Sequence, residues 1–148
     1  MNNERLKLYI KHIDIEELFG IYSYSLPIED MDISKLLILY GENGAGKTTV
    51  LQMVFNLLSS ETAQGHKTEL ANTKFKKITI SLSNGYEISA YRKTSLIGEY
   101  YLSIYNINKE IIDVPCRVVV EDGEYVVRTT NDESEKVDIY LNFVKDLN

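Results

Sequence analysis

Short stretches of the chain alternate between apolar and polar residues, a pattern that predicts half-buried β-strands. The first stretch opens the chain, with Leu6, Leu8 and Ile10 as its apolar positions. Further alternating stretches span residues 22–28, 76–93, 100–107 and 117–129. Because proline cannot donate a ladder hydrogen bond, Pro27 predicts that the second strand lies at a sheet edge or ends there.

The alternation in 76–93 predicts a β-hairpin whose register depends on the length of its turn. A two-residue turn would place Ile80 opposite Ser89, so apolar and polar sets would share a face. The three-residue loop 83–85 places Ile80 opposite Ile88 instead. We therefore expect the longer loop, with its glycine in a left-handed bulge position.

Two other segments carry turn chemistry. The pair Asp122-Gly123 predicts a second hairpin with a two-residue turn, which places Val120 opposite Tyr125. The polar run 29–32 predicts a turn.

Residues 35–40 form a continuous apolar run, which is typical of a strand buried on both faces of a mainly parallel sheet. Apolar residues from Val50 to Leu58 then recur at helical spacing and predict a mostly buried helix. The polar segment 59–74 is expected to be a loop. Residues 137–147 predict a helix near the end of the chain, although 137–143 would also fit a strand.

Composition places the chain among ordinary globular proteins. It has 148 residues, of which 44% are hydrophobic and 26% charged, and these values predict one domain with a real core. No signal-like or membrane-spanning apolar segment is evident. Cys116, the single cysteine, is expected to be a small strand residue in a reducing compartment, so we expect a cytoplasmic protein.

The charge pattern argues against nucleic-acid binding by this chain alone. The net charge is −6, and the basic cluster at 74–77 is short enough to be a solvated strand entry.

The most specific motif is G-x-x-x-x-G-K-T, from Gly41 to Thr48. It lies between the apolar run and the apolar helix, the strand–loop–helix context of a phosphate-binding loop. Glycines let the backbone approach the phosphates, and the helix N-terminus supplies N–H groups and a positive dipole end. Lys47 would reach the β- and γ-phosphates, and the Thr48 hydroxyl would bind Mg²⁺. The residues expected to hold the nucleotide are Gly41, Glu42, Asn43, Gly44, Ala45, Gly46, Lys47, Thr48 and Thr49.

The segment YGENGAGKTTVLQ resembles the Walker A segment of ABC-type ATPases, especially their SMC/RecF-like branch. These are cytosolic ATPases of DNA repair, chromosome organisation and phage defence, also known as AAA-family ATPases. The segment FKKITISLSNGYEISAYRK is similar to the first hairpin of the antiparallel β-subdomain in that branch. The resemblance covers residues 5–107, and only the loop is a specific motif. It implies an α/β fold, a P-loop NTPase lobe of ABC type in which an antiparallel β-subdomain accompanies the Walker A strand and helix.

Other parts of such an ATPase site are not evident in the sequence. Gln52 and Gln64 lie in the wrong places for a Gln loop, and there is no L-S-G-G signature. His12 and His66 come too early for a switch histidine and are expected to be surface or strand residues. The run 118–122 ends in Glu-Asp and turns at once, so we expect a hairpin there and identify no Walker B acid and no catalytic residue.

The resemblance also implies an aromatic or apolar contact to adenine from the region before the loop. Phe19, Tyr22 and Tyr24 are all candidates, and the sequence does not choose among them. Arg5 is a candidate phosphate contact.

These observations predict one Mg·ATP-binding lobe, 1–148, of a larger ATPase, which binds ATP but hydrolyses little alone. A second chain or a further half would complete the site, in a head-to-head dimer when complete. DNA would be a partner of the full assembly rather than of this lobe. The alternatives are an ABC transporter subunit, which the missing Gln loop disfavours, a small phosphotransferase, which the few arginines disfavour, and a non-enzymatic module regulated by nucleotide.

Overall fold

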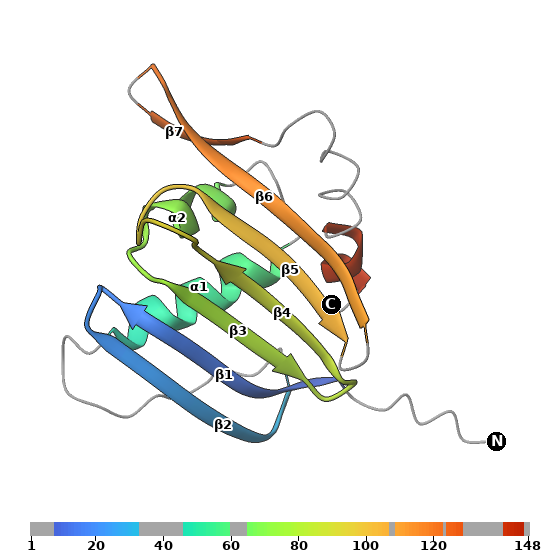
Figure 1. Ribbon diagram of the computed structural model, residues 1–148. Helices are drawn as coiled ribbons and strands as arrows, with labels where there is room; N and C mark the ends of the chain where they lie inside the picture. Colours follow the sequence, from blue (N-terminus) through green and yellow to red (C-terminus); the bar gives the residue numbers. More distant parts are fainter. Residues whose placement is uncertain are drawn as a thin grey trace.

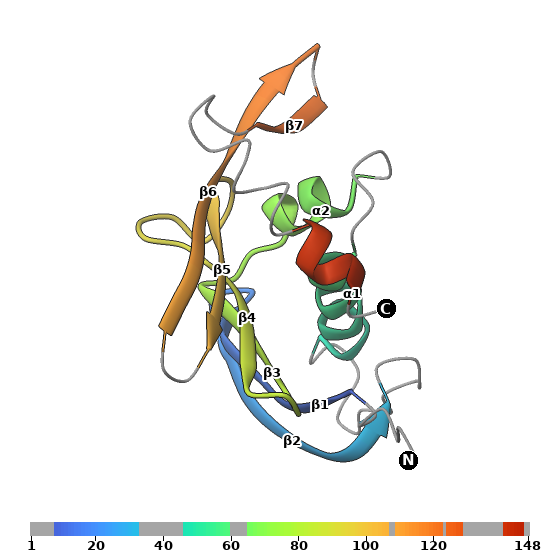
Figure 2. The same ribbon diagram turned by 90° about the vertical axis from the view of Figure 1, so that its right-hand side faces the viewer.

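The computed structural model describes residues 8–32, 46–59, 65–106, 109–122, 124–128 and 141–146. These residues form a curved sheet with helices on one face, as the two views in Figure 1 and Figure 2 show. Its elements are β1 (Tyr9–Leu18), β2 (Tyr22–Asp32), α1 (Lys47–Leu58), α2 (His66–Asn72), β3 (Lys77–Leu82), β4 (Tyr86–Tyr91), β5 (Tyr100–Asn106), β6 (Lys109–Glu121) and β7 (Glu124–Arg128). Residues 141–146 are helical and lie on the same face as α1.

The strand order is β2-β1-β3-β4-β5-β6-β7, and every pairing among the described strands is antiparallel. The expected P-loop NTPase lobe of ABC type, with its mainly parallel sheet, is therefore wrong. Hairpins join most neighbouring strands, and a hairpin imposes antiparallel pairing, whereas a parallel pair needs a long crossover. The one long connection, from β2 to β3, also delivers an antiparallel strand beside β1. The apolar run 35–40 lies outside the described residues.

The hairpin registers place apolar residues opposite one another, as the sequence predicts. Ile80 faces Ile88 across β3 and β4, and Gly85 has φ 87°, so the three-residue loop is confirmed. Val120 faces Tyr125 across β6 and β7, so the two-residue turn is also confirmed. The edge position of the strand that contains Pro27 is confirmed as well.

Two segments differ from expectation. Residues 29–32, predicted as a turn, continue β2, where Asp32 pairs with Tyr9. The segment 59–74, predicted as a loop, contains α2, in which only Leu70 and Ala71 are buried.

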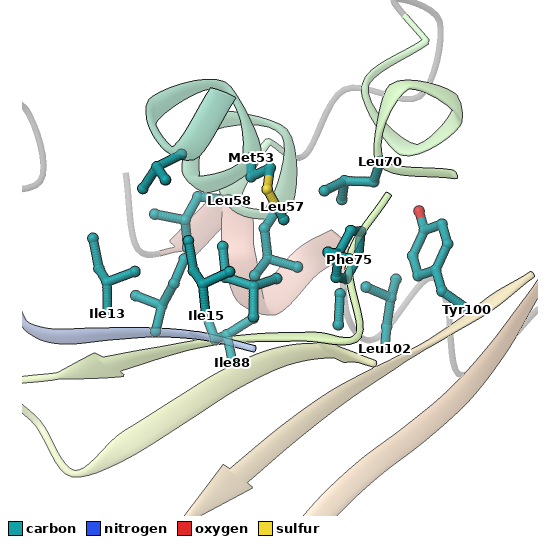
Figure 3. Close-up of a cluster of buried hydrophobic side chains, with 14 of the residues drawn as sticks. Ile13, Ile15, Met53, Leu57, Leu58, Leu70, Phe75, Ile88, Tyr100 and Leu102 are labelled. Carbon is teal, nitrogen blue, oxygen red and sulfur yellow. The ribbon is translucent and has the colours of Figure 1, made fainter. Parts of the chain in front are cut away.

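The core lies between the inner face of the sheet and the helices (Figure 3). Met53 and Leu57 of α1 point towards Ile13 and Ile15 of β1, and all four side chains are almost fully buried. At the other end of the core, Leu70, Phe75, Tyr100 and Leu102 form a second group of buried side chains beneath α2. Burial of these apolar surfaces is the main force that holds α1 on the sheet.

The expectation of a mostly buried α1 is correct for only part of its surface. Val50, Met53 and Leu57 face the sheet, whereas Thr48, Gln52 and Phe55 are exposed, and Phe55 is 63% exposed. Among the described residues, no helix is long and apolar enough to cross a membrane.

Candidate functional site

The described end of the phosphate-binding motif coincides with the start of a helix. Gly46 is the N-cap of α1, with φ 81° and ψ 20°, in the left-handed region that glycine adopts readily. Its carbonyl accepts a hydrogen bond from the N–H of Val50 at 2.8 Å. Lys47 is the first residue of α1, Thr48 is exposed and Thr49 is half-buried. Residues 41–45 lie outside the described part of the chain.

The first turn of α1 has backbone N–H groups that no carboxylate of the same turn can occupy. Among the described residues no side chain caps the helix at Gly46, and the first turn contains no acidic residue. The N–H groups at the start of a helix have no partner within the helix, and together with the dipole they favour an anion there.

The turn between β1 and β2 packs against this end of α1. A Cβ built on Gly46 would lie 2.7 Å from Cδ2 of Leu18 and 3.1 Å from Cε2 of Phe19. Phe19 itself has a positive φ, 55°, and its N–H donates to the carbonyl of Lys74 at 2.7 Å. The turn therefore holds one aromatic ring directly beside the helix start.

Of the three aromatic candidates for a base contact, Phe19 lies nearest to Gly46. The residue is 38% exposed, and its ring meets that of Tyr22 edge-on, with centroids 6.4 Å apart. Tyr22 in turn stacks on Tyr24 at 6.0 Å. The other candidate, Arg5, lies outside the described residues.

The opposite end of α1 is anchored by a lysine from α2. The Lys67 ammonium donates to the carbonyls of Asn56, Leu57 and Ser59 at 2.7, 3.1 and 3.1 Å. The last turn of α1 has no basic residue of its own, so Lys67 supplies the positive charge that this helix end favours.

The buried Asn56 links α1 further to α2. Its amide oxygen lies 3.0 Å from Nδ1 of His66, and its amide nitrogen donates to Glu69 at 3.2 Å. His66 is thus the first residue of α2 and part of a helix–helix contact, where a surface or strand role was expected.

A buried cation lies at the far end of α2. Arg92 is only 6% exposed, and its guanidinium donates to five backbone carbonyls. The acceptors, at 2.9–3.2 Å, are the carbonyls of Leu70, Ala71, Thr73, Phe75 and Gly98. The guanidinium carbon also lies 4.3 Å from the ring centre of Phe75.

Burial lowers the pKa of Arg92 to about 10, and its electrostatic interaction with Tyr100 partly opposes this shift. Neither Arg92 nor Lys67 belongs to a motif, so the sequence alone predicted no role for them. Both side chains stabilise the fold by hydrogen bonds to backbone carbonyl groups from several segments.

The acidic pair Glu121-Asp122, considered as a Walker B position, lies at the β6–β7 hairpin. Glu121 pairs with Glu124, and Asp122 occupies the turn with φ 51°. The hairpin expectation is confirmed.

His12 belongs to a second polar cluster, on the outer face of the sheet and away from the helices. Its Nε2 lies 2.8 Å from Oγ of Ser25 and 3.2 Å from Oδ1 of Asp14, and the Ser25 hydroxyl donates to Asp14 at 2.8 Å. Among the described residues no three His, Cys, Asp or Glu side chains gather to hold a metal ion. A metal site in this cluster would therefore need the Ser25 hydroxyl as a third ligand.

The start of α1, which contains the last three residues of the motif, is therefore the candidate site for a phosphate ligand. Comparisons of the chain with protein-family models and with curated proteins gave no match.

Proposed function

We propose that the chain binds Mg·ATP at the N-terminal end of α1. The observation that carries the proposal is the conformation of Gly46, which is left-handed and begins a 12-residue helix at Lys47 within the G-x-x-x-x-G-K-T motif. A helix start without a side-chain cap leaves N–H groups for the oxygens of a phosphate.

The charge at this helix end supports an anionic ligand. The first turn has no acidic residue, and Lys67 compensates the opposite end of α1. In this proposal the Lys47 ammonium neutralises the β- and γ-phosphates, as in other phosphate-binding loops. The similarity of residues 40–52 to Walker A segments favours ATP over other phosphate ligands.

Thr48 fits the magnesium part of the proposal. It follows Lys47 on α1 and its side chain is exposed. A hydroxyl is a hard oxygen ligand, and Mg²⁺ prefers oxygen ligands shared between protein, phosphates and water. The ion would bridge the phosphates and neutralise part of their charge.

Phe19 is the residue that we propose for the base. The turn at 17–20 holds its partly exposed ring against Gly46, at the same end of α1 as the phosphate donors. A planar ring beside a phosphate site offers a stacking surface to a nucleobase. Tyr22 and Tyr24 support this ring through their own contacts.

We further propose binding without efficient hydrolysis by this chain alone. Hydrolysis requires a group that positions the attacking water. The acidic pair considered for that role, Glu121-Asp122, forms a hairpin turn.

Calorimetric titration of the purified chain with ATP and with a non-hydrolysable analogue, with and without Mg²⁺, tests the proposal. Lys47→Ala should weaken binding by about 10- to 100-fold, the range for loss of a charged hydrogen bond. Thr48→Ala should reduce the Mg²⁺ dependence. The matched controls are Lys145→Ala, in the helix at 141–146, and Thr94→Ala, in the connection between β4 and β5; both positions are exposed.

Three results would count against the proposal. The first is absence of binding by the unmodified chain, and the second is unchanged affinity in Lys47→Ala. Rapid phosphate release that Lys47→Ala abolishes would leave the binding site intact but overturn the claim about hydrolysis.

A further inference from the structure

The cluster of His12, Asp14 and Ser25 is built by neighbouring strands on the sheet face opposite the helices. His12 and Asp14 are two residues apart on β1, and Ser25 is the direct partner of Asp14 on β2. Oγ of Ser25 lies 2.8 Å from both Nε2 of His12 and Oδ1 of Asp14, and these two atoms are 3.2 Å apart. The His12 and Asp14 side chains are 32% and 47% exposed, so the cluster opens to solvent.

A β-bulge is what brings His12 into this cluster. The pairing of β1 shifts register between Ile10 and His12 on both sides, towards β2 and towards β3. Ile10, Ile13 and Ile15 are buried on the inner face. With regular alternation from Ile10, His12 would point inward as well. The extra residue turns His12 outward beside Asp14, the kind of re-aiming that bulges produce next to functional sites.

The geometry does not match a Ser–His–Asp relay. In such a relay the serine contacts one ring nitrogen and the carboxylate the other. Here Ser25 and Asp14 both contact Nε2 of His12, and the serine proton is directed to the carboxylate. The imidazole therefore has no second nitrogen oriented by the carboxylate, and the serine is not activated as a nucleophile.

We propose instead that Nε2 of His12, Oδ1 of Asp14 and Oγ of Ser25 form a site for a divalent transition-metal ion such as Zn²⁺. Bonds of about 2.1 Å from zinc to nitrogen or oxygen separate adjacent ligands by about 3.0 Å in octahedral geometry and about 3.4 Å in tetrahedral geometry. The observed separations of 2.8–3.2 Å are close to those edges. One ion can thus replace the hydrogen bonds of the cluster with little movement of the two strands.

Room for further ligands lies beside the cluster. Asp14 and Ser25 also line an open groove of about 460 Å³ on the same face. Water molecules in this groove would complete the coordination shell, because structural and catalytic zinc ions need at least four ligands. With one imidazole, one carboxylate and one hydroxyl, the site should be weaker than a structural zinc site.

The donor set also indicates which ions should bind. An imidazole nitrogen suits Zn²⁺, Co²⁺, Ni²⁺ and Cu²⁺, whereas Mg²⁺ prefers oxygen ligands. The proposed site is therefore chemically distinct from the magnesium site at α1. It does not rest on the proposed function, since neither His12 nor Asp14 contacts α1 in any described interaction.

The test is a titration of the metal-free, unmodified chain with Zn²⁺ followed by calorimetry, and with Co²⁺ followed by its visible absorption. We expect one ion per chain, with affinities that increase from Co²⁺ to Zn²⁺ and no competition from millimolar Mg²⁺. His12→Gln and Asp14→Asn should each reduce the affinity at least tenfold, and Ser25→Ala should reduce it less. All three side chains are exposed enough for the variants to fold, which a thermal melt without metal checks.

The chain offers a matched control, because its only other histidine is His66 on α2. His66→Gln should leave zinc binding unchanged, and Lys47→Ala should do the same. The proposal is overturned if the unmodified chain binds no zinc at 1 mM, if His12→Gln binds as tightly as the parent, or if His66→Gln abolishes binding. If the unmodified chain bound zinc but not ATP, the function proposed for α1 would be rejected and this site would stand.

Discussion

Leu18 lies so close to Gly46 that a Cβ added to the glycine would come within 2.7 Å of the Cδ2 atom of the leucine. Leu18 is fully buried at the end of β1, and Gly46 begins α1. The closeness of the two residues allows the helix start to rest directly on the sheet. It also means that glycine at this position serves packing as well as any phosphate contact.

Gly46→Ala should therefore lower both stability and ATP affinity. The left-handed conformation costs a residue with a Cβ about 1–2 kcal/mol, and the overlap with Leu18 adds to that cost. We expect the free energy of unfolding to fall by about 2–4 kcal/mol, measured by denaturant titration.

Gly85→Ala is the matched control for this substitution. Gly85 has a similar φ of 87°, but a Cβ there would have no neighbour within 4 Å. The difference between the two variants isolates the overlap at Leu18. Equal losses of stability in both variants would show that the contact with Leu18 has no energetic importance.

The sequence predicted the registers of hairpins, in which a short turn joins two strands. Ile80 faces Ile88 because only that register keeps both apolar sets on the inner face. The bulge before His12 and the extension of β2 to Asp32 were not predictable in this way, because the bulge shifts the pairing of β1 with the distant strand β3 and the extension depends on the pair of Asp32 with Tyr9. α2 was missed because seven residues with two buried side chains give too little periodicity.

The candidate site also has a part that the sequence predicted and a part that it did not. The motif predicted that Gly46 and Lys47 would lie at a helix start, since the loop's function requires one. It did not predict that Phe19 would lie against Gly46, because that contact depends on the positive φ values of the turn at 17–20. The parallel sheet was expected from the resemblance and the run 35–40, whereas the described strands are joined by antiparallel pairs.

Arg92→Met should destabilise the protein more than any exposed substitution. The variant keeps much of the apolar stem but removes the guanidinium donor from five carbonyl groups near α2, of which those of Leu70 and Ala71 keep a backbone N–H donor. Each buried acceptor that stays unsatisfied costs about 1–3 kcal/mol, partly recovered by water or relaxation, so we expect a loss of about 3–5 kcal/mol. Lys93→Met, at the exposed neighbouring position, should cost less than about 1 kcal/mol.

The pH dependence of the Arg92 contribution follows from its lowered pKa. The pKa of about 10 in the folded protein lies below the ordinary value of an arginine side chain. Between these two values the unfolded chain binds more protons, so this group should make stability rise with pH there. Between pH 6 and 9 both states stay protonated. The stability difference between the parent and Arg92→Met should then be constant, and a slope in that window would contradict the assignment.

Lys67→Met should loosen the C-terminal end of α1 and leave most of the core intact. The substitution removes an ammonium that donates to three carbonyls and balances the helix dipole. We expect a loss of about 1–2 kcal/mol in the free energy of unfolding. Amide hydrogen exchange should increase in residues 56–59, while β4 and β5 keep their protection. Lys145→Met serves as the control, because that exposed lysine lies in another helix.

Phe19→Gly should separate base recognition from phosphate recognition. The variant removes the ring beside Gly46, and glycine adopts the φ of 55° without strain, so the turn at 17–20 should keep its shape. Loss of one stacking surface should weaken ATP binding by about 5- to 10-fold, the value for an aromatic contact of about 1 kcal/mol or slightly more. Affinity for inorganic triphosphate should not change, because the phosphate donors of α1 remain. Ile21→Ala is the matched control, since that side chain is 74% exposed at the same turn. If Phe19→Gly weakened ATP and triphosphate equally, the ring would support the helix start rather than contact the base.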